Sequence, residues 1–461
     1  MPRRLAEETL AAVEAGKGTA RDLLDAGLDR RPLAPRDGDL AREIAYGTLR
    51  RLSTLDLLLQ ARSSLRLRAL HPRVRAALRA AAYQALFLDR VPAAAAVDHA
   101  VGAARAAAGA RAAGYANAVL RSLAREIEGR AEGEGDGDPR RTVPTGDGRH
   151  VRLAKARLPD PARDRAASLS ARWSMPRWLV KRWRESLGEE RALEVLRASA
   201  ARPGTWLRPL PGREDALRAA LAGAGVASEE EGDPASFLLR GAGAVEGIPG
   251  FREGLFVVQD PAAARAAALL DPRPGESVLE VGAGRGGKTS FLAARVGERG
   301  RVIAVDRDVR RLALLRETLA RVLPGTGSVQ VVAGDALEPG VLPPGPFDRV
   351  LVDAPCTNTG VLARRVEARA RLRPRDVEAL AALGRRLLEA SLERLRPGGT
   401  AVHSVCSLEP EEGPDTVRRA IRRDPALSLG EEELLLPLPG RRDGGYAAVI
   451  RRAPALQSPL P

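Results

Sequence analysis

Between residues 277 and 450 the chain repeats one pattern, in which short apolar runs alternate with longer segments of helical spacing. Runs of four or five mostly apolar residues separated in this way are typical of parallel strands joined by crossover helices. Such runs lie at 278–281, 302–305, 329–332, 349–352 and 400–404. We therefore predict a doubly wound parallel α/β sheet in this half of the chain. A run at 444–450 is predicted to be its last strand, antiparallel and at the edge of the sheet.

The rest of the chain is predicted to hold other kinds of domain. Residues 1–128 place apolar side chains at helical spacing, most clearly at 74–88, which predicts an all-α bundle. Residues 129–149 carry almost no apolar side chain and cannot offset the entropy of ordering, so a flexible linker is expected there. A mixed stretch at 150–255 is expected to form a small α+β middle domain, and the α/β domain is expected to span 256–455.

Composition limits the partners and the compartment of the protein. The chain has 74 Lys and Arg residues against 59 Asp and Glu, a formal net charge of +15, which favours a polyanionic partner such as nucleic acid. Two cysteines cannot build a disulfide framework, and the four histidines lie singly, without the spacing of zinc ligands. The start of the chain has no apolar signal segment, and no uncharged apolar run reaches ~18 residues. We therefore expect a cytoplasmic monomer without a metal or a membrane partner.

The first strand of the predicted sheet runs into a glycine-rich loop, Gly282–Thr289, that satisfies two patterns. It matches the dinucleotide-type pattern G-x-G-x-x-G and also the P-loop pattern G-x-x-x-x-G-K-T of nucleoside triphosphatases. Asp353, after a later apolar run, would serve such a triphosphatase as a magnesium ligand. Asp306 instead lies 22 residues after Gly284, where a carboxylate can accept hydrogen bonds from both ribose hydroxyls. With Asp335 placed to meet an adenine amino group, the set favours an adenosine ligand without a triphosphate.

Both cysteines of the chain follow apolar runs that end in polar residues, so each is expected where a buried strand opens onto a loop. Cys356 and Cys406 lie 50 residues apart, and we predict that their thiols meet in one pocket. Two thiols suit methylation of cytosine, whose carbon 5 becomes nucleophilic only after a thiolate adds to carbon 6. One cysteine would add and the other would assist release, while Asp353 supports the charge that develops at N3. The alternative interpretation is a pair of small, buried, inert side chains.

This chemistry also requires certain surroundings. The nucleophile must be ionised, so a cation is expected near it, and Lys288, Arg364 and Arg365 are the candidates. A base that is attacked from its face must leave its stack, which suits a basic protein of several domains.

Several motifs resemble the NOL1/NOP2/Sun family of RNA cytosine-5 methyltransferases, in particular its bacterial ribosomal RNA members. Asp353–Gly360, with the sequence D-A-P-C-T-N-T-G, is similar to the family's D-A-P-C-S-x-T-G, and Cys406–Glu412 is similar to its C-S-x-x-P-E-E. Gln259–Asp260 is similar to the family's Q-D ahead of the glycine loop. Glu280 and Arg285 stand where the family has aspartate and proline. Segments that resemble a NusB-type RNA-binding domain lie at 47–51, 78–84 and 117–121.

The resemblance implies the activity, the cofactor and the role of each site residue. The chain would transfer a methyl group from S-adenosylmethionine to carbon 5 of a cytosine in 16S rRNA. Cys406 would be the nucleophile, Cys356 the residue that assists release, and Asp353 a contact to both cytosine and methyl donor. A helical NusB-like domain would hold RNA, ahead of a Rossmann-like methyltransferase domain. The implied cofactor-binding residues are Gly282, Ala283, Gly284, Arg285, Gly286, Gly287, Lys288, Asp306, Asp335 and Asp353.

Other functions stay open at this point. An enzyme of the same kind could act on transfer RNA. The glycine loop would suit a P-loop ATPase that remodels RNA. A NusB-like RNA-binding protein with an inactive catalytic domain is the non-enzymatic alternative.

Overall fold

The computed structural model describes residues 1–133, 137–232, 235–240 and 244–455. Contacts within the chain divide it into two units. The helical unit comprises Met1–Arg202 together with Leu362–Arg371, and the α/β unit comprises Pro203–Val361 together with Leu372–Pro461. The four-part division into domains that the sequence suggests stays a prediction.

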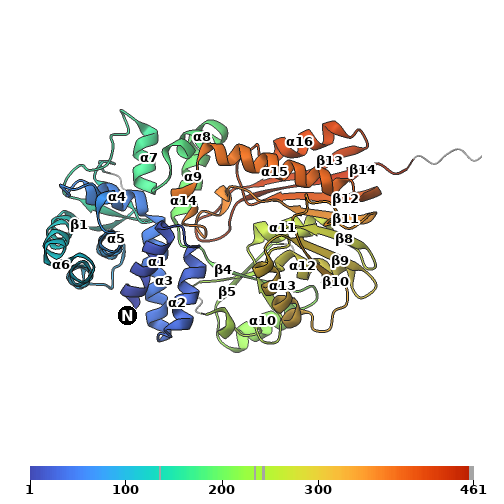
Figure 1. Ribbon diagram of the computed structural model, residues 1–461, viewed down its shortest axis with the longest axis horizontal. Helices are drawn as coiled ribbons and strands as arrows, with labels where there is room; N and C mark the ends of the chain where they lie inside the picture. The colour runs from blue at the N-terminus through green and yellow to red at the C-terminus, as the bar shows by residue number, and fades with distance from the viewer. Residues whose placement is uncertain (134–136, 233–234, 241–243, 456–461) are drawn as a thin grey trace, which may run out of the picture. The chain divides into compact units, whose positions relative to one another are not determined.

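The N-terminal part of the helical unit is an all-α bundle, as the apolar spacing predicts (Figure 1). Its helices are α1 (Pro2–Glu14), α2 (Ala20–Arg30), α3 (Pro35–Arg50), α4 (Leu52–Gln60), α5 (Pro72–Phe87) and α6 (Ala93–Arg125). Helix α5 is buried on most of its surface and packs against α1, α3, α4 and α6. Alanines on the facing sides of α5 and α6 allow a close approach, because they fill little of the space between the two backbones.

The segment expected to be a flexible linker contributes residues to a small antiparallel sheet. Its strands, in the order β1-β3-β2, are β1 (Ile127–Glu132), β2 (Thr142–Pro144) and β3 (Arg149–Leu153). The few apolar side chains here suffice because Val143, Val151 and Leu153 are all buried in the core of the helical bundle. The charged side chains are tied by ion pairs, for example those of Asp89 with Arg130 and Arg149. Residues 134–136, also part of the expected linker, lie outside the described residues.

The helical unit continues to residue 202 and then takes a second segment from much later in the chain. Helices α7 (Arg165–Trp173), α8 (Arg177–Leu187) and α9 (Glu189–Ala200) complete the first part. The second segment, Leu362–Arg371, ends in the short helix α14 (Ala368–Arg371). Val366 is buried in the same core as helices α1 and α3. The buried guanidinium of Arg369 donates to the carbonyl oxygens of Arg50, Ser199 and Leu362.

The α/β unit is built on a mixed sheet of seven strands in the order β10-β9-β8-β11-β12-β14-β13. The strands are β8 (Ser277–Val281), β9 (Arg301–Asp306), β10 (Val329–Ala333), β11 (Phe347–Asp353), β12 (Leu395–Val405), β13 (Leu427–Leu435) and β14 (Gly445–Arg452). All the predicted strands are confirmed, and β14 is antiparallel to β12 as expected. The prediction that β14 forms the edge is wrong, because β13 lies outside it. The pattern of β13 is hidden by glutamates such as Glu432 and Glu433, whose partners are Tyr446, Arg418 and Arg265.

Helices cover both faces of this sheet, which confirms the doubly wound arrangement (Figure 1). One face carries α11 (Pro261–Leu270), α12 (Gly287–Val296) and α13 (Val309–Val322), and the other carries α15 (Pro374–Leu392) and α16 (Pro414–Arg423). Alternate residues of each strand serve the two sides. On β11, for instance, Leu351 packs under α11 and α12, whereas Val350 and Val352 pack under α15.

A second, four-stranded sheet lies ahead of the main sheet in the sequence. Its order is β5-β6-β4-β7, with β4 (Thr205–Pro209), β5 (Ser228–Glu231), β6 (Ser236–Leu239) and β7 (Phe256–Val258), and α10 (Glu214–Gly223) packs on it through Leu217 and Leu221. This is the α+β structure expected for part of the 150–255 stretch. Every helix in the described part of the chain is too short or too polar to cross a membrane.

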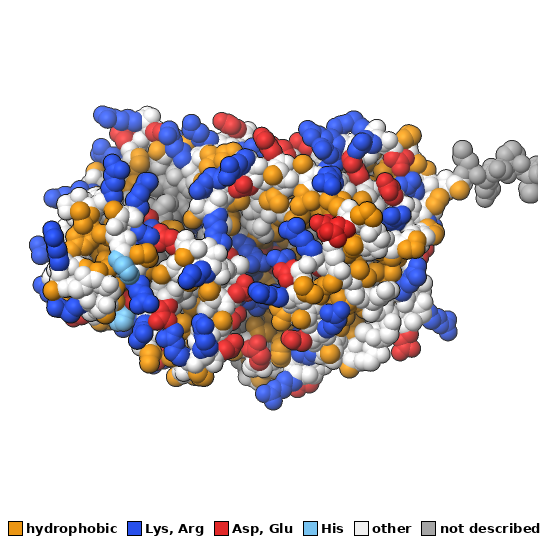
Figure 2. All heavy atoms as spheres, in the orientation of Figure 1, with side chains coloured by type: hydrophobic (Ala, Val, Ile, Leu, Met, Phe, Trp, Pro, Cys, Tyr) orange, Lys and Arg blue, Asp and Glu red, His pale blue; other side chains and the backbone are white. Residues whose placement is uncertain are grey.

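The basic side chains are spread over the surface. Figure 2 shows Lys and Arg side chains across the visible face, interleaved with Asp and Glu and with apolar side chains. Many of the arginines are held in ion pairs, as in Arg79 with Glu14 and Asp56. A charge excess distributed in this way supports general attraction to a polyanion, while a specific contact requires a more defined site.

Candidate active site

The carboxyl ends of neighbouring parallel strands bring the predicted site residues together. Strand β11 lies between β8 and β12 and runs parallel to both. Its last residue, Asp353, pairs in register with Ser404 of β12. The glycine loop after β8, the Asp353–Gly360 loop and the Cys406–Glu412 loop therefore all start at one edge of the sheet, where open α/β sheets bind their ligands.

The two thiols meet, as the sequence predicts. The Sγ atoms of Cys356 and Cys406 lie 3.3 Å apart, with Cys356 buried and Cys406 half-buried. The hydrogen bond to Cys406, together with burial, holds the pKa of the Cys356 thiol well above its usual value. Cys356 therefore stays protonated at neutral pH and can donate a hydrogen bond to the Cys406 sulfur.

Asn358 contacts both cysteines, a role that the sequence did not reveal. Its Nδ2 donates to the carbonyl oxygen of Cys356 at 2.8 Å, and its Oδ1 accepts from the Cys406 Sγ at 3.2 Å. Asn358 has a φ of 61°, a left-handed conformation that asparagine tolerates better than most residues. The turn places its amide between the Cys356 carbonyl oxygen and the Cys406 sulfur. The only signal was its place inside the D-A-P-C-T-N-T-G motif.

A buried carboxylate joins the two cysteine loops. Glu412 accepts the main-chain N–H of Thr357 at Oε1, at 2.8 Å, and the Thr357 hydroxyl at Oε2, at 2.6 Å. Its own carbonyl oxygen lies 2.9 Å from Nε2 of the buried His403, on β12. Burial raises the pKa of Glu412 to about 7, although hydrogen bonds from Ser407 and Thr357 oppose the shift. Glu412 thus fixes the loop that follows Cys356 relative to the loop that follows Cys406.

Hydroxyl and main-chain contacts reinforce this connection. The Thr359 hydroxyl lies 3.0 Å from the Ser407 hydroxyl and accepts the main-chain N–H of Leu408 at 2.9 Å. Gly360 donates its N–H to the carbonyl oxygen of Cys406 at 3.1 Å. A side chain at Gly360 would lie 2.3 Å from the carbonyl oxygen of Gly444, so the close approach of the backbones requires glycine there.

Lys288 supplies the cation of the site. Its Nζ donates to Oδ2 of Asp353 at 2.8 Å, and both residues lie beside the cysteines at the edge of the sheet. Burial alone would lower the pKa of Lys288, but the charge and hydrogen bond of Asp353, with smaller contributions from Glu280 and Cys406, outweigh it and the pKa is raised. Of the other cations considered from the sequence, Arg364 and Arg365 belong to the Leu362–Arg371 segment of the helical unit.

The glycine loop has left-handed backbone positions that suit glycine, and hydrogen bonds hold it in place. Gly282 has a φ of 85°, and a side chain there would lie 2.2 Å from the carbonyl oxygen of Asp353. The N–H of Gly284 is accepted by Oδ2 of Asp306 at 2.8 Å, and Oδ1 of Asp306 accepts the N–H of Asp308. Asp306 thus anchors the loop at its expected place after β9. Asp335 follows β10 and accepts the N–H of Leu337 at 3.0 Å, a turn contact.

Two further buried charges lie under this loop. Arg208, on β4, donates to Oε1 of Gln259 at 2.6 Å and to the carbonyl oxygen of Gly287, and its guanidinium lies 5.1 Å from the Phe291 ring centre. Burial lowers the pKa of Arg208 to about 9. Arg208 and Gln259 therefore brace the start of α12; the Q-D motif was the signal for Gln259. Glu280, at the end of β8, is fully buried, which raises its pKa to about 8 and leaves it largely neutral at pH 7.

The described residues do not meet the requirements of a metal site. In the described part of the chain, no cluster of His, Cys, Asp and Glu is arranged to hold a metal ion.

Comparisons with known proteins agree with this geometry. The model of a family described as 16S rRNA methyltransferase RsmB/F matches residues 267–438, a range that includes the glycine loop and both cysteine motifs. The model of the NusB family matches residues 1–125, the helical bundle.

Individual relatives cover most of the chain. The chain is 33% identical over 430 residues to the ribosomal RNA small subunit methyltransferase B of Vibrio cholerae, which covers 91% of each chain. It is 33% identical over 464 residues to the protein of the same name in Pseudomonas putida, covering 97% of this chain and 98% of the relative. A crystal structure of a methyltransferase homolog from Pyrococcus horikoshii matches 63% of this chain and 99% of its own, with a TM-score of 0.55 and 27% identity.

Proposed function

This chain belongs to the 16S rRNA methyltransferase RsmB/F family, and from that membership we propose that it methylates carbon 5 of a cytosine in 16S rRNA. RNA is its substrate and S-adenosylmethionine is its methyl donor. The observation that carries the choice of cytosine carbon 5 is the 3.3 Å separation of the Cys356 and Cys406 sulfurs. Carbon 5 is a weak nucleophile until a thiolate adds to carbon 6. A stacked base offers no open face to a sulfur, so the target base flips out of its stack.

Cys406 is the nucleophile in this proposal. Its sulfur forms a bond to carbon 6, and the electrons of the carbon 5–carbon 6 double bond move toward carbon 5. Three features support Cys406 over Cys356: it is half-buried where Cys356 is buried, the Cys356 thiol keeps its proton, and Lys288 interacts electrostatically with Cys406. The ammonium of Lys288 stabilises a thiolate beside it and orients the carboxylate of Asp353.

The glycine loop fits the adenosine-containing cofactor. When bound, S-adenosylmethionine supplies a methyl group on a positively charged sulfur. Gly282 to Lys288, Asp306, Asp335 and Asp353 would hold it. A side-chain carbon built at Gly284 would meet no atom closer than 3.9 Å, so the backbone there faces open space. Asp306 is the last residue of β9, and Asp335 follows the neighbouring strand β10. Both carboxylates therefore lie at the same edge of the sheet as the glycine loop.

Cys356 assists release of the product. Its pKa is held high first by the hydrogen bond to Cys406, then by burial and by the charge of Cys406. Once the Cys406 sulfur is bonded to carbon 6, it is no longer a thiolate and the effects that depend on it weaken. Cys356 then gives its own proton to water, and the resulting thiolate takes the proton from carbon 5. The electrons of the broken carbon 5–hydrogen bond re-form the carbon 5–carbon 6 double bond and expel the Cys406 thiolate from carbon 6.

The experiment that tests this assignment compares the two cysteine variants. A 16S rRNA transcript and labelled S-adenosylmethionine are incubated with wild type, Cys406→Ala, Cys356→Ala and, as control, Arg111→Ala on the exposed surface of α6. We expect no transfer by Cys406→Ala, and an RNA–protein adduct that survives denaturation with Cys356→Ala. Methylation by Cys406→Ala would contradict the assignment of the nucleophile.

The same preparation separates the remaining alternatives. Bulk transfer RNA, offered in place of the 16S transcript, tests for a transfer RNA enzyme, and we expect the ribosomal transcript to be methylated faster. Lys288 forms an ion pair with Asp353, whereas the lysine of a P-loop ATPase binds the γ-phosphate of ATP. This ion pair disfavours the ATPase alternative. We therefore expect S-adenosylmethionine to raise the unfolding temperature and ATP to leave it unchanged.

A further inference from the structure

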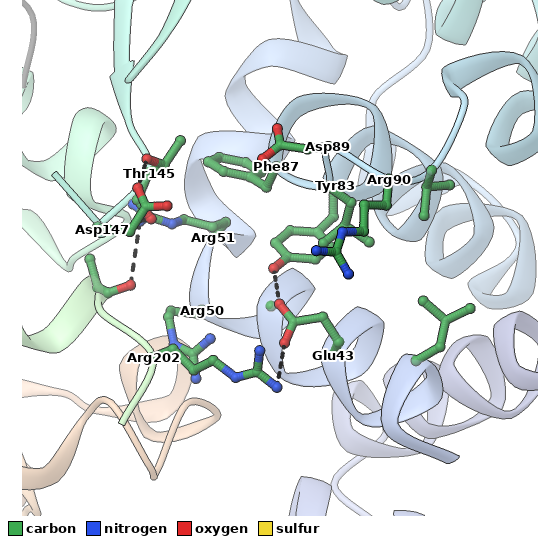
Figure 3. A pocket seen from close by; sticks show the side chains of 16 residues that line it. Glu43, Arg50, Arg51, Tyr83, Phe87, Asp89, Arg90, Thr145, Asp147 and Arg202 are labelled. Carbon is green, nitrogen blue, oxygen red and sulfur yellow. Dashed lines mark hydrogen bonds and ion pairs between the residues drawn. The ribbon is translucent and has the colours of Figure 1, made fainter. Parts of the chain in front are cut away.

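The helical unit contains a pocket of about 470 Å³ that the proposed chemistry does not use. It is lined by α3, by α5 and the turn after it, by the turn that follows β2, and by the end of α9 (Figure 3). The volume falls in the range of pockets that hold a small ligand. Its lining combines aromatic and cationic side chains, which are Arg50, Arg51, Tyr83, Phe87, Arg90 and Arg202.

Two arginines in the wall of the pocket are buried and have no carboxylate partner within the described ranges. Arg50 is 7% exposed and donates to the carbonyl oxygen of Ala363, and Arg51 is 2% exposed and donates to the carbonyl oxygens of Thr145 and Ala200. The Nε of Arg50 and the Nη1 of Arg51 are buried and have no hydrogen-bond partner among the described residues. A buried cation and an unmade hydrogen bond are both costly unless an anion completes them.

A third buried arginine adds to this positive charge. Arg369, 4% exposed, donates to three carbonyl oxygens, one of them that of Arg50. Burial, together with the charge of neighbouring arginines, lowers the pKa of Arg51 to about 10 and that of Arg369 well below its usual value. The cluster is therefore electrostatically unfavourable in the free protein, and an anion beside Arg50 and Arg51 would relieve it.

The acidic side chains of the lining form their ion pairs with arginines other than Arg50 and Arg51. Glu43 accepts the Tyr83 hydroxyl at 2.7 Å and pairs with Arg202 at 3.4 Å (Figure 3). Asp89 and Asp147, at the mouth, pair with Arg149, at 3.0 and 2.7 Å, and Asp89 pairs also with Arg130. The pocket thus has an excess of cations that these carboxylates do not satisfy.

One wall of the pocket is aromatic. The rings of Tyr83 and Phe87 stack with their centres 5.3 Å apart and their planes 21° from parallel. The guanidinium of Arg51 lies 5.2 Å from the Phe87 ring centre, so cation and aromatic surface adjoin. A side chain at Gly47 would lie 2.0 Å from the Tyr83 ring, and its absence lets the ring lie against α3. Aromatic faces next to cations are what proteins use to hold unstacked bases of single-stranded RNA.

We propose that this pocket binds one nucleotide of the RNA substrate, with its phosphate on the arginines and its base against the Tyr83–Phe87 wall. The proposal rests on the proposed function only in taking RNA as the ligand. In this proposal the helical unit binds one unpaired nucleotide specifically, in addition to attracting RNA through its general positive charge.

The test compares matched substitutions inside and outside the pocket. Arg90 and Arg202 are exposed at its mouth, so the double variant Arg90→Ala/Arg202→Ala removes two cations without disturbing a core. Arg105→Ala/Arg111→Ala makes the same change of charge on exposed positions of α6. Phe87→Leu removes the ring and keeps an apolar side chain. The unfolding temperature of each variant is measured first, and binding of a 16S rRNA transcript is measured at several salt concentrations.

We expect the mouth variant to weaken RNA binding about tenfold more than the α6 variant. It should also lower the slope of log affinity against log salt by about 1 for each phosphate that is no longer neutralised. Phe87→Leu should weaken binding about tenfold and leave the slope unchanged, because stacking releases no counterions. Equal effects of the mouth and α6 variants would overturn the proposal in favour of diffuse attraction. So would tight binding of CMP that the transcript does not displace, since the site would then serve a free nucleotide.

Failure of this proposal and failure of the proposed function give different results. Cys406→Ala should bind the transcript like wild type and show the same salt slope. If wild type binds RNA with the pocket-dependent pattern but methylates no cytosine, the proposed function fails and the nucleotide site stands. If wild type methylates and the pocket variants keep its KM for RNA, only the nucleotide site fails.

Discussion

Glu412 accepts hydrogen bonds from both the main-chain N–H and the hydroxyl of Thr357, at 2.8 and 2.6 Å. Thr357 directly follows Cys356, and Glu412 ends the loop that begins with Cys406. The carboxylate therefore holds the two cysteine loops together through Thr357, and in this way it fixes the distance between the two sulfurs. Glu412 is in this sense a positioning residue.

Glu412→Gln should impair methylation more strongly than it destabilises the fold. A glutamine side chain has one oxygen, so one of the two Thr357 donors is left without its acceptor, at a cost of about 1–3 kcal/mol. We expect kcat to fall about tenfold or more, because the sulfurs are no longer held at a fixed separation. The control is Glu393→Gln, an exposed position, which should match wild type. Unchanged kcat in Glu412→Gln would show that the loops hold their geometry without the carboxylate.

The stability gap between wild type and Glu412→Gln should depend on pH. Burial raises the pKa of Glu412 to about 7 from its usual 4.5. A carboxyl group whose pKa is raised on folding holds its proton more tightly in the folded state, so it stabilises the fold most below pH 4.5 and this contribution is lost as the pH rises through 7. Glutamine does not titrate. Urea unfolding of both proteins between about pH 5 and pH 8 should therefore show a gap that narrows as the pH rises; a widening gap would contradict the raised pKa.

Mild oxidation should join the two thiols and stop methylation. The Sγ atoms of Cys356 and Cys406 lie 3.3 Å apart, so a movement of about 1 Å brings them to the length of a disulfide bond. Diamide should remove both free thiols and all activity, and dithiothreitol should restore both. Cys356→Ser, with one thiol left, should keep that thiol under the same treatment. Loss of activity without loss of both thiols in wild type would point to oxidation elsewhere.

Alanine substitutions at two glycines should distinguish the cost of a left-handed backbone from an effect on cofactor binding. Gly284, in the glycine loop, and Gly297, at the end of α12, have φ values of 58° and 66° and open space where a side chain would go. Alanine at either position should lower the free energy of unfolding by about 1 kcal/mol, through the left-handed backbone. Only Gly284→Ala should also reduce the rise in unfolding temperature caused by S-adenosylhomocysteine, because its methyl group occupies the space above the loop. An equal response of both variants to that ligand would remove the loop from the cofactor site.

Apolar patterning predicted most of the α/β unit. The central strands β8 and β11 carry short buried apolar runs, such as Val278–Leu279 and Val350–Val352, because helices cover both faces of the sheet there. Strands with solvent on one side were missed, because charge conceals their pattern. Strand β13 carries Glu431, Glu432 and Glu433, and β1–β3 lie in a stretch that resembles a linker until Val143 and Val151 are seen in the core.

The reactive residues of the site could be predicted from the sequence, but the residues that hold them in place could not. Both cysteines were identified because the topology of a parallel sheet brings the ends of neighbouring strands together, and no other cysteines compete. Asn358, Arg208 and the clamp of Glu412 on Thr357 depend on contacts between loops whose conformation is set by the folded protein. Local sequence does not specify such contacts, so only the motifs around them gave a signal.

The helical unit is discontinuous, and this imposes an order on its synthesis. Val366 and Arg369 belong to its core, yet they are made only after strands β8 to β11 of the main sheet and the Asp353–Gly360 loop. A fragment that ends at Arg202 would lack both, and the carbonyl oxygens of Arg50 and Ser199 would be left without their donor. On the ribosome, where domains fold as their residues emerge, the N-terminal helices therefore cannot complete their packing first. Neither unit is therefore contained in a single stretch of the chain, and a single cut between the two would leave each without part of its contacts.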